Sequence, residues 1–120
     1  MYNNPSDYFY DVYLLLDSEN DFCSAVSRLY YCAFHLMREA LRKSRTKTAN
    51  THKAIRVKYC ELFELQENIV LEWYKLRERV DYMHSGTFYV GTEFDKMRVG
   101  EMLAFVRRCM ANRPNTNVKV

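Results

Sequence analysis

The stretch DFCSAVSRLYYCAFHLMREALRK, residues 21–43, decides the fold. Apolar side chains recur in it at intervals of three and four residues, which is the spacing of one face of an α-helix. A pattern sustained over this length predicts a long amphipathic helix whose apolar face packs into a core. That face consists of Phe22, Ala25, Val26, Leu29, Tyr30, Ala33, Met37, Ala40 and Leu41.

The same spacing predicts four further helices, over residues 6–16, 51–63, 66–84 and 92–110. We expect Ser6 and Thr51 to cap two of them. With only three glycines and two prolines in 120 residues, the chain lacks the turn residues that a β-sandwich needs. The prediction is an all-α, up-and-down bundle of four or five helices, with one domain over residues 1–110 and a flexible tail over 111–120. Besides the first two helices, the inward residues are expected to be Ile55, Tyr59, Leu62, Phe63, Trp73, Leu76, Val80, Met83, Phe94, Met97, Phe105, Val106 and Cys109.

Composition excludes several classes of protein. Hydrophobic residues make up 48% of the chain and charged residues 28%, as in soluble globular domains. No segment approaches the roughly 18 apolar residues of a membrane span, and the first residues do not resemble a signal peptide. The four cysteines are scattered singly, which disfavours a zinc site or a disulfide framework. We therefore expect a cytoplasmic protein without membrane contact, metal or cofactor. A net charge of +3 permits an anionic partner without requiring one.

Polar residues line the opposite side of the 21–43 helix. They form either an ordinary solvated face or a dimer interface or anionic groove, because arginine and tyrosine are favoured in both. The basic loop at residues 42–50 is likewise either solvated or in contact with a phosphate backbone. His52 falls in the first turn of a helix, where its charged form is disfavoured, so we expect it to be structural or exposed. The residues of the polar side are Ser24, Arg28, Tyr31, His35, Arg38 and Arg42.

Residues 73–84, WYKLRERVDYMH, place Arg77, Asp81 and His84 on one flank of a helix. Positions four and seven residues beyond Arg77 return to within roughly 40° of it. Arg79 lies about 160° away and approaches His84 only if the helix loosens. A guanidinium that holds a phosphate and an imidazole that moves a proton are the minimum for metal-free RNA cleavage. The alternative is that both are solvated groups at a helix end.

Two motifs indicate a family. AVSRLYYCAFH at residues 25–35 resembles the pattern A-x-S-R-x-Y-Y-A-x-F-H of HEPN domains, and LRERVDY at residues 76–82 resembles their L-R-x-R-A-D-Y segment. The resemblance covers roughly residues 6–110. It implies a HEPN-like helical bundle that forms a homodimer. Many HEPN proteins are metal-independent endoribonucleases, often toxins whose antitoxin is a nucleotidyltransferase.

The active site of this family is an arginine followed, after four to six residues, by a histidine. Carried over, this gives Arg79 or Arg77 with His84, and Asp81 and Tyr82 as supporting residues. The expected product carries a 2′,3′-cyclic phosphate. The tyrosine that the modified toxins carry two residues after the histidine is Gly86 here. The alternative implied by the resemblance is a non-catalytic interaction or nucleotide-binding module that docks a nucleotidyltransferase.

Overall fold

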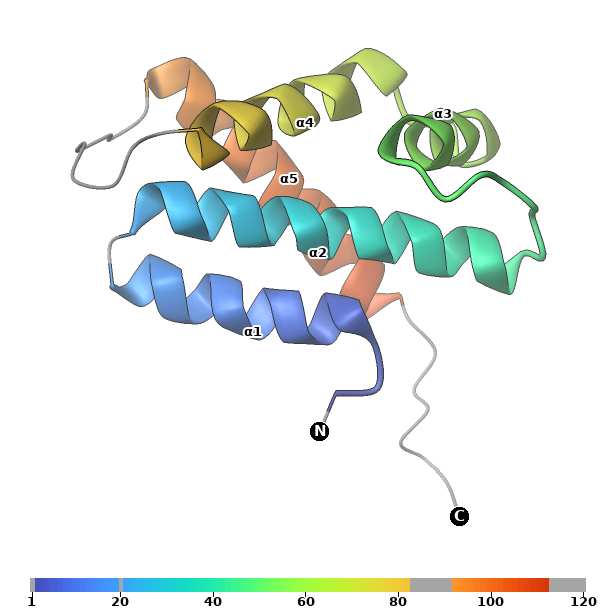
Figure 1. The fold of residues 1–120 in the computed structure, drawn as a ribbon, viewed down its shortest axis with the longest axis horizontal. Coiled ribbons are helices and arrows are strands. Elements are labelled where there is room, and N and C mark those ends of the chain that lie inside the picture. Colours follow the sequence, from blue (N-terminus) through green and yellow to red (C-terminus); the bar gives the residue numbers. More distant parts are fainter. Residues whose placement is uncertain (1, 20, 83–91, 113–120) are drawn as a thin grey trace.

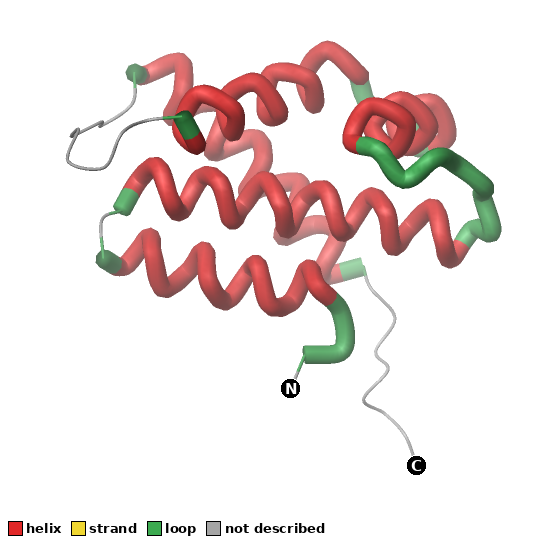
Figure 2. The backbone as a smooth tube through the Cα atoms, viewed as in Figure 1, coloured by secondary structure: helices red, strands yellow, loops and turns green. Residues whose placement is uncertain are grey.

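Five α-helices make up the part of the chain that the structure, a computed structural model, describes: residues 2–19, 21–82 and 92–112. These ranges contain no strand (Figure 2). The predicted all-α class is confirmed, and every helix begins within one residue of the predicted position. The helices are α1 (Pro5–Ser18), α2 (Phe22–Lys43), α3 (His52–Leu62), α4 (Glu67–Asp81) and α5 (Glu93–Ala111).

Helix α2 is the centre of the arrangement, because it packs against all four other helices. Figure 1 shows α1 running antiparallel beside it, α4 on its other side, α5 crossing behind it, and α3 seen nearly end-on. The side chains of Leu29, Cys32 and Ala33 on α2 are completely excluded from solvent. The apolar face predicted for residues 21–43 therefore forms the floor of the core.

The core is completed by α4 and α5. Trp73, Leu76 and Val80 on α4 are buried, which confirms the predicted stripe, whereas Met83 lies outside the described residues. On α5, Phe105 packs against Trp73 with ring centroids 5.4 Å apart. None of the described helices is long and apolar enough to cross a membrane.

Four predicted core positions were wrong. Phe94 is 52% exposed, Met97 51%, Leu62 48% and Phe63 45%. They lie in the opening turns of α5 and at the end of α3. Periodicity identifies the apolar face of a helix but not how far along that face a neighbouring helix extends, so the pattern overestimated burial at the helix ends.

The predicted caps had mixed outcomes. Thr51 does cap α3, because its hydroxyl accepts a hydrogen bond from the Ala54 N–H at 3.1 Å. Ser6 does not cap α1, which begins at Pro5 after Asn4. Instead Ser6 is fully buried and its hydroxyl donates to the Glu39 carboxylate at 2.6 Å. Of the predicted tail, residue 111 ends α5, and residues 113–120 lie outside the described part.

We expect Leu29→Ala to lower the free energy of unfolding by about 2–5 kcal/mol, because it leaves a cavity among four helices. The matched control is Leu62→Ala at the end of α3, where the side chain is 48% exposed and the change should stay within about 0.5 kcal/mol. Urea denaturation at pH 7 measures both. Equal decreases in the two variants would contradict the central position of α2.

Candidate functional site

Arg77 is the best-defined of the predicted catalytic residues. Its guanidinium carbon lies 5.5 Å from the ring centroids of Tyr30 and Tyr31 and 4.9 Å from that of Tyr74. Such contacts attract a cation to the negative face of the ring. Arg77 Nη1 also donates to Asp81 Oδ2 at 3.2 Å, and the Arg77 side chain is only 14% exposed. The guanidinium is thus held in one place between α2 and α4.

The same surroundings keep Arg77 charged. Burial lowers its pKa, but the hydrogen bond to Asp81 and the nearby tyrosines outweigh burial, so the pKa is raised overall. The buried Nε of Arg77 finds no hydrogen-bond acceptor among the described residues. Arg77 and Asp81, which the sequence predicts to share one helix flank, therefore do contact each other, and this contact fixes the cation near the end of α4.

Arg79 points to a different neighbour. Its Nη2 pairs with Asp95 Oδ1 of α5 at 2.5 Å, and Asp95 has a side-chain exposure of 6%. Asp95 also belongs to the capping box of α5, in which the Thr92 hydroxyl accepts from the Asp95 N–H. Arg79 thus links the end of α4 to the start of α5, and this ion pair stabilises the packing of the two helices.

The predicted histidine, His84, lies outside the described residues. Tyr82, the last described residue before it, is 78% exposed. The pairing of His84 with either arginine therefore rests on the spacing of these residues in the sequence. Tyr82 projects into solvent at the end of α4, and the supporting role expected for it stays a prediction.

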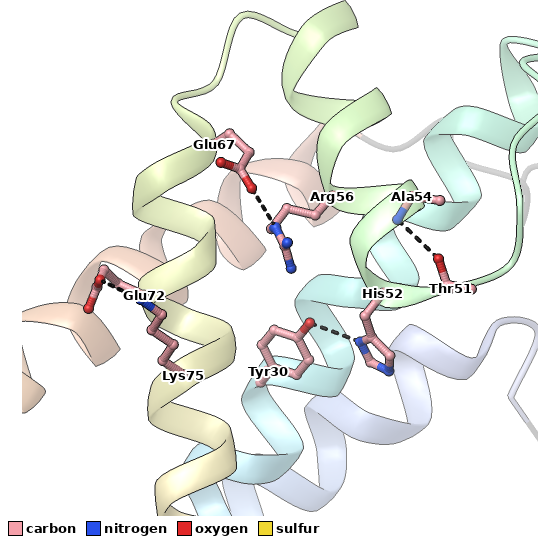
Figure 3. A network of polar contacts seen from close by, with 8 residues as sticks. All are labelled: Tyr30, Thr51, His52, Ala54, Arg56, Glu67, Glu72 and Lys75. Atoms are coloured by element: carbon pink, nitrogen blue, oxygen red, sulfur yellow. Dashed lines mark hydrogen bonds and ion pairs between the residues drawn. The ribbon is translucent and has the colours of Figure 1, made fainter.

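His52, which the sequence predicts to be structural or exposed, packs in the aromatic cluster that also contacts Arg77. Figure 3 shows His52 of α3 facing Tyr30 of α2, and the distance from Tyr30 Oη to His52 Nδ1 is 3.0 Å. The His52 ring stacks on Phe34 with centroids 4.2 Å apart. Burial, and then the positive charges of Arg77 and Arg56, lower the pKa of His52. His52 is therefore a neutral, half-buried part of an aromatic cluster near neutral pH.

A second guanidinium borders this cluster. Arg56 of α3 reaches toward α4, where its Nε donates to Glu67 Oε1 at 2.8 Å (Figure 3). The Arg56 side chain is 9% exposed, and its guanidinium lies 5.7 Å from the Tyr74 ring. Arg77 and Arg56 thus approach the same tyrosine. Sequence reasoning missed this arrangement, because nothing in the spacing of residues 52 and 56 relates them to residues 74 and 77.

The polar side of α2 is partly covered by neighbouring helices, although Arg42 at its end is exposed. Arg28, Tyr31, His35 and Arg38 are all half-buried. Phe9 of α1 stacks on Tyr31 at 5.6 Å and on His35 at 5.3 Å between centroids. Of these residues, the structure brings Tyr31 into contact with Arg77. Arg28 forms no ion pair with any described residue. Arg38 lies nearer the C-terminal end of α2, away from Arg77.

Within the described ranges, no three histidine, cysteine, aspartate or glutamate side chains gather closely enough to hold a metal ion. Comparison of the chain with models of protein families, with curated proteins and with solved structures found no match. The resemblance to HEPN domains accordingly stays a prediction from the two motifs. The residues of the site must carry any functional proposal.

Burial, and then electrostatic repulsion from Arg38, His52 and Arg42, lower the pKa of His35 from 6.5 to about 4. Between these pH values the unfolded state binds more protons than the folded state, so stability falls as the pH drops from 6.5 to 4. We expect His35→Gln to remove about 1–2 kcal/mol of this acid destabilisation, after allowance for solvent screening of the half-exposed ring. Urea denaturation at pH 7 and pH 4.5 measures it. An identical acid destabilisation in both proteins would contradict the assignment.

Proposed function

We propose that the chain is a metal-independent endoribonuclease of the HEPN type, with Arg77 and His84 as its catalytic pair. The observation that carries this proposal is the position of Arg77, which is charged, held against three tyrosine rings, and seven residues before His84. A fixed guanidinium is suited to a phosphate group. Tyr31 and Tyr74 are half-buried beside it, and aromatic rings of this kind stack with unpaired bases.

In the proposed reaction the ribose 2′-oxygen attacks the adjacent phosphorus, and the bond from phosphorus to the 5′-oxygen breaks. His84 accepts the 2′-hydroxyl proton or donates a proton to the leaving 5′-oxygen, and in a homodimer the two copies of His84 can divide these tasks. Arg77 stabilises the negative charge that develops on the phosphorane. The products are a 2′,3′-cyclic phosphate and a 5′-hydroxyl.

Arg77 is preferred to Arg79 on physical grounds. Withdrawing Arg79 would break its 2.5 Å ion pair with Asp95, a carboxylate that is only 6% exposed, and breaking a buried ion pair is costly. Asp81 is 33% exposed, so water can replace Arg77 when a phosphate takes the guanidinium. Arg79 accordingly holds the end of α4 against α5.

The proposal includes a homodimer and a nucleotidyltransferase as antitoxin. The support for the dimer, besides the motifs, is that Tyr8, Leu14 and Leu15 of α1 are 47%, 44% and 58% exposed. Tyr8 and Leu15, seven residues apart, lie on one face of α1, and contiguous exposed apolar side chains are typical of surfaces that bind a partner. We expect sedimentation equilibrium to give twice the 14.4 kDa mass of the chain and Leu15→Glu to reduce it toward the monomer. A monomer at every concentration would contradict the dimer.

A second function is favoured by one observation. In the described part of the chain both candidate arginines already have carboxylate partners, Asp81 and Asp95. This suits a non-catalytic interaction or nucleotide-binding module in which the same cations serve only packing. A nucleotidyltransferase would dock on that module without any RNA being cut.

Cleavage of single-stranded RNA in EDTA separates the two functions. We expect His84→Ala to lower the cleavage rate by about 10²–10⁴-fold, the usual contribution of a general acid or base. Arg77→Ala should lower it by about 10²–10³-fold, the usual contribution of a group that stabilises developing charge. We expect Arg79→Ala to reduce stability more than rate. The product should carry a 2′,3′-cyclic phosphate, which treatment with acid converts to a monophosphate.

Lys75→Ala is the matched control, because this α4 lysine is 55% exposed and its nearest carboxylate, Glu72, is 3.9 Å away. It should cleave at the wild-type rate. Undiminished cleavage by His84→Ala would exclude the proposed pair. Growth arrest on expression that persists in His84→Ala would instead support the interaction module.

A further inference from the structure

A second concentration of positive charge lies at the far end of α2. A pocket of about 330 Å³ opens there between α2, the loop that follows it and the start of α3. Leu41 and Ile55 form its apolar floor, and both side chains are 1% exposed. Its polar lining consists of Arg38, Arg42, Thr46, Lys47, Thr48 and Asn50. No carboxylate is among the described residues that line it.

The cations of this pocket have no carboxylate partners in the described part of the chain. Of the seven ion pairs found there, none includes Arg38, Arg42 or Lys47, although all aspartates and glutamates fall within the described ranges. Arg38 and Arg42 are four residues apart on one helix, a spacing at which like charges destabilise the helix. An anion between them would remove that repulsion.

The loop that closes the pocket is held in place by its own hydrogen bonds. The Thr46 N–H donates to the Leu41 carbonyl at 2.9 Å, and the Ser44 and Thr46 hydroxyls lie 2.8 Å apart. Arg45 adopts a φ of 58°, which reverses the chain after α2. Hydroxyl groups and an amide side chain are therefore brought beside two guanidinium groups.

We propose that this pocket binds a backbone phosphate of a single-stranded RNA whose scissile phosphate is held at Arg77. Arginine, lysine, hydroxyl and amide groups are the donors that proteins use for backbone phosphates. From Tyr31, which contacts Arg77, to Arg38 and Arg42 is about 10–17 Å along α2 at 1.5 Å per residue. Half-buried His35 lies between the two ends. The choice of RNA as the ligand rests on the proposed function, whereas the phosphate chemistry does not.

The test compares two double variants in a full-length His84→Ala background, which prevents cleavage. Arg38→Gln/Arg42→Gln changes the pocket, and Lys75→Gln/Arg107→Gln removes the same charge from exposed positions on α4 and α5. Fluorescence anisotropy gives the affinity for a labelled single-stranded RNA at several salt concentrations. The slope of log K against log[salt] should become shallower by about 0.7 for each phosphate that the protein no longer neutralises, in the pocket variant only. If the double variant does not fold, Lys47→Gln replaces it, because Lys47 lines the same pocket at an exposed loop position. The salt slope should then become shallower in this variant.

A second measurement does not depend on RNA. Titration of inorganic phosphate into ¹⁵N-labelled protein should shift the amide signals of Thr46, Thr48 and Asn50 to saturation, and sodium chloride at equal ionic strength should not. Absence of these shifts in the pocket variant supports the inference. Equal salt slopes for the pocket and control variants overturn it. If phosphate saturates the pocket but no variant binds RNA, both the RNA ligand and the endoribonuclease proposal fail, and a site for free phosphate or a nucleotide is left.

Discussion

The fold depends on the enclosure of α2. Because four helices pack around it, its apolar face is shielded from solvent, and the middle of its polar side is only partly exposed. Phe9 of α1 covers His35 and part of Tyr31, while α3 and α4 bring His52 and Arg77 against the same side. Groups that would ordinarily be hydrated are thereby made to contact one another, and the candidate site is the result.

Charge in this bundle is divided between paired and unpaired cations. Arg56, Arg77 and Arg79 each have a carboxylate partner on α4 or α5, which links neighbouring helices or turns. Arg38 and Arg42 at the end of α2 have none in the described part of the chain. Burial and then these two arginines, among its neighbours, lower the pKa of His35, so their charge acts on a group one turn and more away along the helix. The positive potential therefore extends from the pocket toward the aromatic cluster.

The features that depend on local residue spacing could be predicted from the sequence. The length of α2, the stripe of Trp73, Leu76 and Val80, and the Thr51 cap all follow from contacts within one helix or one turn, so the pattern predicted them. Contacts between helices could not be predicted from this pattern. The bond between Tyr30 and His52 joins residues 22 apart and exists only because α3 crosses α2 at that point. For the same reason Phe94, apolar and at helical spacing, was wrongly assigned to the core.

The proposed preference for Arg77 over Arg79, which first rested on helical spacing, is supported by what each arginine would leave behind if it turned to a phosphate. An i,i+4 pair such as Arg77 with Asp81 contributes about 0.2–0.5 kcal/mol on an exposed helix, and Asp81 retains access to water. A bidentate, charge-assisted bond to phosphate exceeds this amount, so an incoming phosphate can replace Asp81. Asp95 is only 6% exposed and has no such access, and breaking a buried ion pair costs several kcal/mol. A cation that can exchange its partner is available to a substrate, whereas one that cannot is part of the scaffold.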